Sequence, residues 1–190
     1  MLSLIEQKAG EYIIELFSAR LPKELCFHDK AHTLDVVKAV TLIGEQSRLA
    51  EENIKLLQIA AWFHDSGYTI SYHDHEAESI IIAENFLQPL LCPQEYIVQI
   101  CALIAATRAP QNPQNLAECV ICDADLFHLA KPDYKRYEQR LRDEWAFYLH
   151  KTLSDKDWKL LNIDFLIEHR YFTTYGQTVL QELKLKNIKI

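Results

Sequence analysis

Glycine and proline are scarce in this chain. Its 190 residues include four glycines and six prolines, which argues against a β-sandwich with many tight turns. Long apolar runs are missing too. No segment approaches the roughly 20 apolar residues that cross a bilayer, and the first residues lack the basic start and long apolar core of a signal peptide. We therefore expect a cytoplasmic protein without membrane contact.

Basic residues are outnumbered, 20 against 27 acidic ones, which gives a formal net charge of -7. A surface of this sign repels polyanions, so we expect no non-specific binding of nucleic acid. A local basic pocket for a small phosphate compound is still compatible with it. The five cysteines form an odd set without a secretion signal and predict reduced, mostly buried thiols. Cys119 and Cys122 resemble half of a zinc knuckle, but no second pair at finger spacing accompanies them.

Apolar residues recur at helical spacing along almost the whole chain, and strict alternation is rare. The pattern predicts an all-α fold, a single domain over residues 1–190 built as a bundle of about eight or nine helices. A short strand at Val120–Ile121 is the competing prediction at one place. The expected helices cover residues 5–17, 32–48, 51–65, 76–87, 94–107, 116–129, a segment that Pro132 opens, 155–170, and 174 to near the C-terminus.

Histidine and aspartate stand where the apolar runs end. His64 and Asp65 directly follow one such run, Asp125 closes a later one, and His32 begins the predicted helix upstream. Burial of a charge is costly unless the charge is paired or bound to a metal. The three places together predict a metal site with four ligands, which are His32, His64, Asp65 and Asp125. The competing interpretation is that these residues are satisfied polar groups of the core and of helix caps.

The mixture of two imidazoles and two carboxylates indicates which ion would bind. It suits Mn, Fe, Co, Ni or Zn better than calcium, which prefers oxygen ligands alone; Mg stays open. Four such ligands leave coordination positions free for water and a phosphate oxygen, as a catalytic ion needs. The ion can lower the pKa of bound water and polarise a phosphoryl group.

The same residues, in this order, give the chain a resemblance to the HD superfamily of metal-dependent phosphohydrolases. Phe27-His28-Asp29 is similar to that family's aromatic-His-Asn start, and Phe63 to Tyr68 surrounds the His-Asp pair. His75-Glu76 resembles the segment that follows the pair. The similarity covers residues 25–129, which leaves residues 130–190 as a helical C-terminal extension. It implies an HD-type helical bundle that binds a divalent transition metal.

The resemblance implies that Asp125, rather than Asp123, is the last ligand. Two residues apart on a helix, the two side chains point about 200° from each other, so only one of them can face the site. Spacing alone leaves the choice open, and Asp123 could be a supporting partner or a cap. Some relatives use extra histidines for a second ion. Here the expected second histidine is replaced by Ala105 to Arg108, which favours a single ion.

Asp65, His75 and Glu76 are the candidate catalytic residues. His75 or Glu76 could orient a water molecule or protonate a leaving oxygen; the alternative is a loop histidine and a glutamate favoured by a helix N-terminus.

Candidate substrate-binding residues are His28, Lys30 and Arg108, because imidazolium, ammonium and guanidinium groups bind phosphate. The polar loops 68–74 and 109–115 are expected at the mouth of the site.

The sequence thus predicts a metal-dependent phosphohydrolase, a phosphomonoesterase or phosphodiesterase, acting on a nucleotide or another small phosphate ester. The alternative is a non-catalytic HD-fold sensor or scaffold that binds a phosphorylated ligand. Such domains usually lose one or more ligands, and this chain has all four. The expected partner is a small phosphorylated substrate, and the protein is expected to be a monomer or a homodimer.

Overall fold

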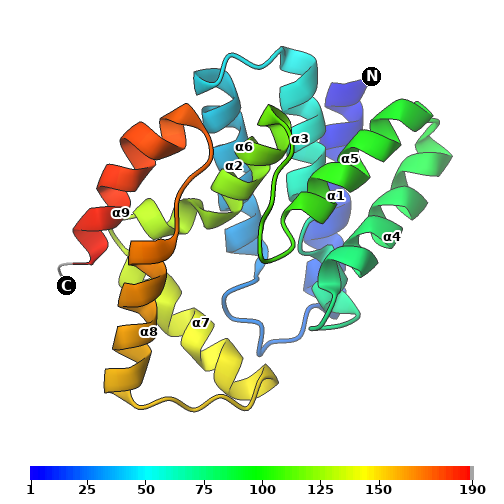
Figure 1. Cartoon of the computed structure of the whole chain (residues 1–190). Helices are drawn as coiled ribbons and strands as arrows, with labels where there is room; N and C mark the ends of the chain where they lie inside the picture. The colour runs from blue at the N-terminus through cyan, green and yellow to red at the C-terminus, as the bar shows by residue number, and fades with distance from the viewer. Residues whose placement is uncertain (189–190) are drawn as a thin grey trace.

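The computed structural model describes residues 1–188, and these residues form α-helices joined by short turns, without a strand. The all-α prediction is therefore confirmed, and so is the expected number of helices for the described part (Figure 1). The nine α-helices are α1 Leu2–Arg20, α2 Lys30–Gln46, α3 Glu51–Phe63, α4 His75–Leu87, α5 Gln94–Ala106, α6 Leu116–Asp125, α7 Tyr134–Tyr148, α8 Asp155–Glu168 and α9 Gln181–Asn187.

The main core lies between α1 and α6, with α3 at its centre. Helix α3 packs against α1, α2 and α5, and α2 also packs against α6. Except for the half-buried Gln58, the last two turns of α3 are buried, and Leu57, Ile59 and Phe63 have no exposed surface. A helix that is apolar all round is stable only where other helices surround it. This surrounding places the end of α3, and the His64-Asp65 pair after it, deep in the protein.

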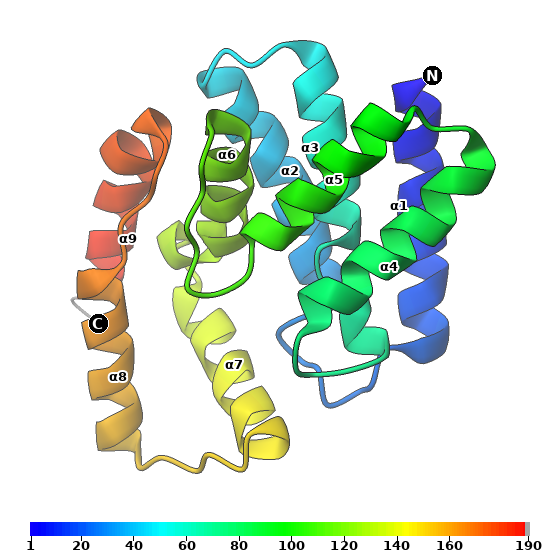
Figure 2. The same ribbon diagram turned by 45° about the vertical axis from the view of Figure 1, so that its right-hand side comes forward.

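The C-terminal helices form a separate, smaller packing unit. Helices α7 and α8 extend away from the bundle, and the loop that joins them lies at the end of the pair farthest from the bundle (Figure 2). Helix α9 lies beside α6. The small core of this unit consists of Leu129, Tyr134 and Leu166. Two ion pairs tie the start of this unit to α2. Arg140 binds Asp29 at 2.8 Å, and Lys131 binds Asp35 at 2.5 Å.

The predicted helix over residues 116–129 ends earlier than expected. Helix α6 stops at Asp125, and residues 126–130 form a 3₁₀ turn. Carbonyl groups of this turn accept hydrogen bonds from side chains far along the chain, Leu126 from the Tyr171 hydroxyl and Leu129 from the Asn187 amide. The competing strand at Val120–Ile121 is wrong, because both residues lie inside α6 and are fully buried.

The third helix is also shorter than the predicted 51–65. It ends at Phe63, and the chain continues as a 3₁₀ turn over Ser66–Thr69. The Ser79 hydroxyl of α4 donates to the His64 carbonyl at 2.7 Å, so this carbonyl is already satisfied where the helix stops. Among residues 1–188, no helix combines the length and the apolar character that crossing a membrane requires.

Candidate metal centre

His32 lies in the first turn of α2, and that turn is fixed by its N-cap. The Asp29 carboxylate accepts hydrogen bonds from the backbone N–H groups of Ala31 and His32, at 2.9 and 3.0 Å. Such a cap satisfies donors that have no partner within the helix. Asp29 is itself held by Arg140 of α7. The His32 ring is thereby presented to the interior, where the residue is only 2% exposed.

His64 follows the last residue of α3, and its ring orientation is set by the helix itself. Its Nδ1 atom lies 2.8 Å from the Ala61 carbonyl oxygen, which can only accept a hydrogen bond. Nδ1 must therefore carry the proton. Nε2 is left to face the interior with its lone pair, the arrangement typical of a metal-binding histidine.

Asp65 lies in the turn that links α3 to α4, and a glycine makes this turn possible. A Cβ atom on Gly67 would collide with the His75 backbone carbonyl. The Gly67 N–H donates instead to the Ser79 hydroxyl at 2.8 Å, which brings the turn against α4. Asp65 is held at this point with its carboxylate 4% exposed.

Asp125, the last residue of α6, faces the two imidazoles, whereas Asp123 faces away. One Asp125 oxygen lies 3.3 Å from His32 Nε2 and 3.6 Å from His64 Nε2. The other accepts a hydrogen bond from Gln111 of the loop 109–115. Asp123 accepts its hydrogen bonds from Phe172 and Thr173. The side chains thus diverge as the helical spacing predicts, and Asp125 is the one in position to be a ligand.

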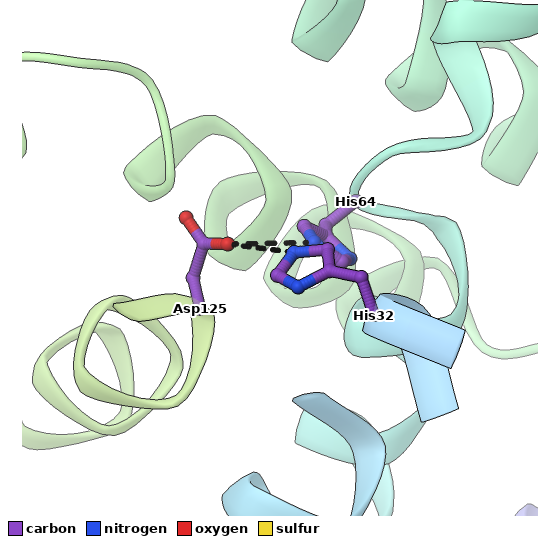
Figure 3. A group of neighbouring side chains, drawn as sticks. All are labelled: His32, His64 and Asp125. Atoms are coloured by element: carbon purple, nitrogen blue, oxygen red, sulfur yellow. Dashed lines mark ion pairs between the residues drawn. The ribbon is translucent and has the colours of Figure 1, made fainter. Parts of the chain in front are cut away.

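Three of the four predicted ligands, His32, His64 and Asp125, meet at one point (Figure 3). The ligand atoms of His32, His64 and Asp125 all lie within 4.8 Å of one another. Asp65 approaches the same imidazoles, with Oδ2 at 3.4 Å from His32 Nε2 and 3.1 Å from His64 Nε2. Ligands at about 2.1 Å from a common ion lie roughly 3 to 3.4 Å apart. The observed separations suit that geometry.

Three of these ligand atoms are buried without a hydrogen bond. They are His32 Nε2, His64 Nε2 and Asp65 Oδ2. An unsatisfied buried polar atom costs about 1–3 kcal/mol, so three at one point need an explanation. A single divalent cation would satisfy all three, and the residues therefore fit the expected metal. His32, His64 and Asp125 are compatible with a divalent ion, whereas their assignment as ligands with Asp65 stays a prediction.

The charges at this point favour a cation. Burial raises the pKa of the Asp65 carboxyl, but the neighbouring His64 imidazole, in its protonated form, outweighs burial and holds the pKa well below its usual value. Burial also raises the pKa of the Asp125 carboxyl, but the imidazoles of His32 and His64 outweigh burial and lower this pKa below its usual value. Both acids are therefore ionised at neutral pH and attract positive charge. Since a proton and a metal ion compete for the same imidazoles, ion binding should weaken in acid.

His75 and Glu76 border the centre from the first turn of α4. His75 Nε2 lies 3.5 Å from Asp65 Oδ1 and 3.6 Å from Glu76 Oε1. Arg108 reaches this edge from the end of α5, with Nε 3.8 Å from Glu76 Oε2 and Nη2 3.2 Å from Asp74 Oδ1. The ion pair of Arg108 and Asp74 connects the two polar loops, residues 68–74 and 109–115, that the sequence predicts at the mouth of the metal site.

His28 is the second imidazole that packs against Tyr68, and its ring centroid lies 6.3 Å from that of His75. The Tyr68 ring stacks on His75 at 3.8 Å and on His28 at 4.5 Å between centroids. His28 Nδ1 is 2.5 Å from the buried carboxylate of Glu144 on α7. Burial opposes a charge on His28, but Glu144 outweighs this effect and raises the pKa of His28 above its ordinary value. Lys30 is exposed and forms no ion pair among the described residues.

Glu144, Tyr68 and Gln111 belong to the surroundings of the site but were not predicted. Glu144 stands in the charged segment of α7, which resembles a solvated helix face, yet it is fully buried. No spacing rule links it to His28, 116 positions away. Tyr68 lies three residues after Asp65, and this position alone could have marked it as a residue near the site.

A comparison with protein families agrees with this geometry. The model of the family described as HD domain matches residues 30–130, more than half of the chain. All four candidate ligands lie inside the matched segment, whereas His28, Glu144 and the helices from α7 onward lie outside it. No curated protein and no solved structure matches the chain at a significant level. The division into a core of residues 25–129 and an extension of residues 130–190 stays a prediction.

Proposed function

The chain belongs to the HD domain family, and from this premise we propose that it is a metal-dependent phosphohydrolase that acts on a nucleotide or another small phosphate ester. The observation that carries the proposal is the convergence of three buried, unsatisfied ligand atoms on one point. Structural zinc sites usually close with four Cys or His ligands. A set of two imidazoles and two carboxylates instead leaves room for water and substrate.

The ion would be held by His32, His64, Asp65 and Asp125. One ion of Mn, Fe, Co, Ni or Zn is proposed, because imidazole ligands disfavour magnesium and calcium. When bound, it would lower the pKa of a coordinated water and polarise a phosphoryl oxygen. The Nδ1–H of His64 is committed to Ala61, so His64 can act as a ligand but not as a proton carrier at that atom.

His75 and Glu76 are proposed to handle the water molecule that attacks. His75 Nε2 faces both Asp65 Oδ1 and Glu76 Oε1. A water molecule held beside Asp65 would lie within reach of a proton acceptor on His75. Stacking on Tyr68 fixes the plane of the His75 ring, which favours one direction of proton transfer over others.

His28 and Arg108 are proposed to bind the phosphate, with Lys30 as a further cation near the entrance. Glu144 raises the pKa of His28 and so favours its positively charged form, which could donate to a phosphate or leaving-group oxygen. Arg108 is half exposed and is paired with Asp74 and Glu76. A bound phosphate would compete with these carboxylates for the guanidinium.

The experiment that tests the proposal compares two histidine variants. The purified protein is loaded in turn with Mn²⁺, Co²⁺ and Ni²⁺ and assayed for phosphate release from a panel of nucleotides and sugar phosphates. His64→Gln should remove bound metal and lower kcat/KM at least about a thousandfold, because the ion provides both nucleophile and electrophile. His73→Gln is the matched control, since His73 is an exposed histidine of the neighbouring loop.

Helicity should be unchanged in both variants. Metal binding together with ligand binding but no turnover on any substrate would favour the sensor or scaffold alternative. Turnover by His64→Gln equal to that of the wild type would contradict the proposal.

A further inference from the structure

The end of α6 is held, on the side away from the imidazoles, by the C-terminal segment, residues 171–187. The Asp123 carboxylate accepts three hydrogen bonds, from Phe172 N at 2.7 Å, Thr173 N at 2.9 Å and the Thr173 hydroxyl at 2.7 Å. The Thr173 hydroxyl in turn accepts from Gly176 N at 2.9 Å. Asp123 is 1% exposed. These bonds connect two parts of the chain that are about 50 positions apart in sequence.

The residues after Asp125 are held by the same segment. The Tyr171 hydroxyl donates to the Leu126 carbonyl at 3.0 Å. The Asn187 amide donates to the carbonyls of Leu129 and Lys131, at 2.8 and 3.0 Å. Asp125 thus stands between two anchored points, Asp123 before it and Leu126 after it. Its backbone has little freedom to shift along or around the axis of α6.

Gly176 shows how closely the two parts approach. A Cβ atom at this position would collide with Asp123 Oδ2 and come within 3.0 Å of the Thr173 hydroxyl. Because Asp123 is buried and accepts three hydrogen bonds, it can move aside only by breaking them. Any larger residue at position 176 must push α6 or its own backbone aside.

We propose that Thr173 and Gly176 are positioning residues for the metal centre, acting on Asp125 through Asp123. The inference rests on the proposed function, since it assigns a role toward the same ion. Asp123 and Asp125 share the last turn of α6 and point in different directions. A shift of Asp123 would therefore rotate this turn and change the direction in which the Asp125 carboxylate points. Residues that orient a ligand from behind typically change metal affinity about 10–100-fold when they are substituted. By this inference the metal site extends into residues 171–176, beyond the segment that matches the family.

The test measures the dissociation constant for Co²⁺ by competition with a chelator, together with the visible spectrum of bound Co²⁺ and the melting temperature. Thr173→Val removes the hydroxyl but keeps the shape of the side chain, and it should weaken Co²⁺ binding at least about threefold. Gly176→Ala should weaken it at least about tenfold and change the cobalt spectrum. Thr173→Ser keeps the hydroxyl and should restore the wild-type constant.

Two controls separate positioning from loss of stability. Thr178→Val removes a nearby hydroxyl that, within residues 1–188, bonds only to the Thr174 carbonyl, and it should leave the constant unchanged. Leu166→Ala weakens the small C-terminal core without touching Asp123, and it should lower the melting temperature alone. Thr173→Val with a wild-type constant, or Leu166→Ala with an equally weakened one, would overturn the inference. A wild-type protein that binds no ion would instead refute the proposed function and this role together.

Discussion

Lys184 is fully buried, and it has no carboxylate partner among residues 1–188. Its ammonium group donates to the His169 carbonyl at 2.5 Å and lies 5.6 Å from the centre of the Tyr171 ring. Burial lowers the pKa of Lys184 to about 8, and the charge of Arg170 adds to the effect. Burial likewise lowers the pKa of His169 to about 4, helped by Lys184. The two side chains therefore carry one charge between them at neutral pH.

Lys184 is predicted to contribute a free energy of unfolding that increases in mild alkali. Between about pH 8 and 10.5 the unfolded chain binds the Lys184 proton and the folded chain does not, so the contribution of Lys184 to the free energy of unfolding rises with pH. From pH 8.0 to 9.5 the gain should be roughly 1.5 kcal/mol relative to Lys184→Met, which cannot titrate. Urea unfolding at both pH values measures it. Lys186→Met, at an exposed lysine of the same helix, should keep the wild-type slope. Equal slopes in the wild type and Lys184→Met would contradict the assigned pKa.

At the level of elements, the turn between α3 and α4 is what brings the His-Asp pair to the centre. Gly67 lets the turn lie directly on the first turn of α4, where Ser79 binds both the Gly67 N–H and the His64 carbonyl. The same contact places His75 within 3.5 Å of Asp65. Gly67 and Ser79 thus fix the relative position of two catalytic candidates, Asp65 and His75.

Gly67→Ala should therefore destabilise the protein by about 3 kcal/mol or more, because the added methyl group meets a backbone carbonyl that cannot move aside. Thermal unfolding and metal content would measure the change. Gly44→Ala in α2 is the matched control. Its Cβ would lie 3.1 Å from Ile54 Cγ1, an atom of a half-buried side chain that can shift, and the helix gains propensity. A similar loss of stability in both variants would show that the turn has no special role.

Over the whole molecule, the candidate ion would connect three helices that are distant in sequence. His32 begins α2, His64 and Asp65 follow α3, and Asp125 ends α6. A ligand that binds only the folded state raises the free energy of unfolding by RT ln(1 + [L]/Kd), about 2.7 kcal/mol at a hundredfold excess over Kd. For a domain of this size, that corresponds to a rise in melting temperature of roughly 5–10 °C.

Calorimetry with and without saturating Mn²⁺ or Co²⁺ would measure this rise, with EDTA reversing it. His64→Gln should show no rise, because the ligand is missing, whereas His73→Gln should behave as the wild type. A rise of equal size in His64→Gln would indicate that the ion binds at another place.

The sequence determined the helical class, the approximate helices and the four candidate ligands. These features are local. An apolar face repeats every 3.6 residues, and the cost of burying charge marks His64 and Asp65 wherever they lie on an apolar run. The helix ends were predicted less well, because the carbonyls of Leu126 and His64 find their donors on Tyr171 and Ser79, which no local pattern reveals.

The family resemblance implied Asp125 as the last ligand, but only the tertiary structure decided which aspartate of α6 faces the imidazoles and which acid holds His28. Helical spacing shows that Asp123 and Asp125 diverge but not which of them points inward, since that depends on where α2, α3 and the C-terminal segment lie. Glu144 stands among charged residues and would be judged exposed, yet the packing of α7 against Phe27 and His28 buries it. A side chain's partners across more than a hundred residues are set by how helices pack, and packing is a property of the whole chain.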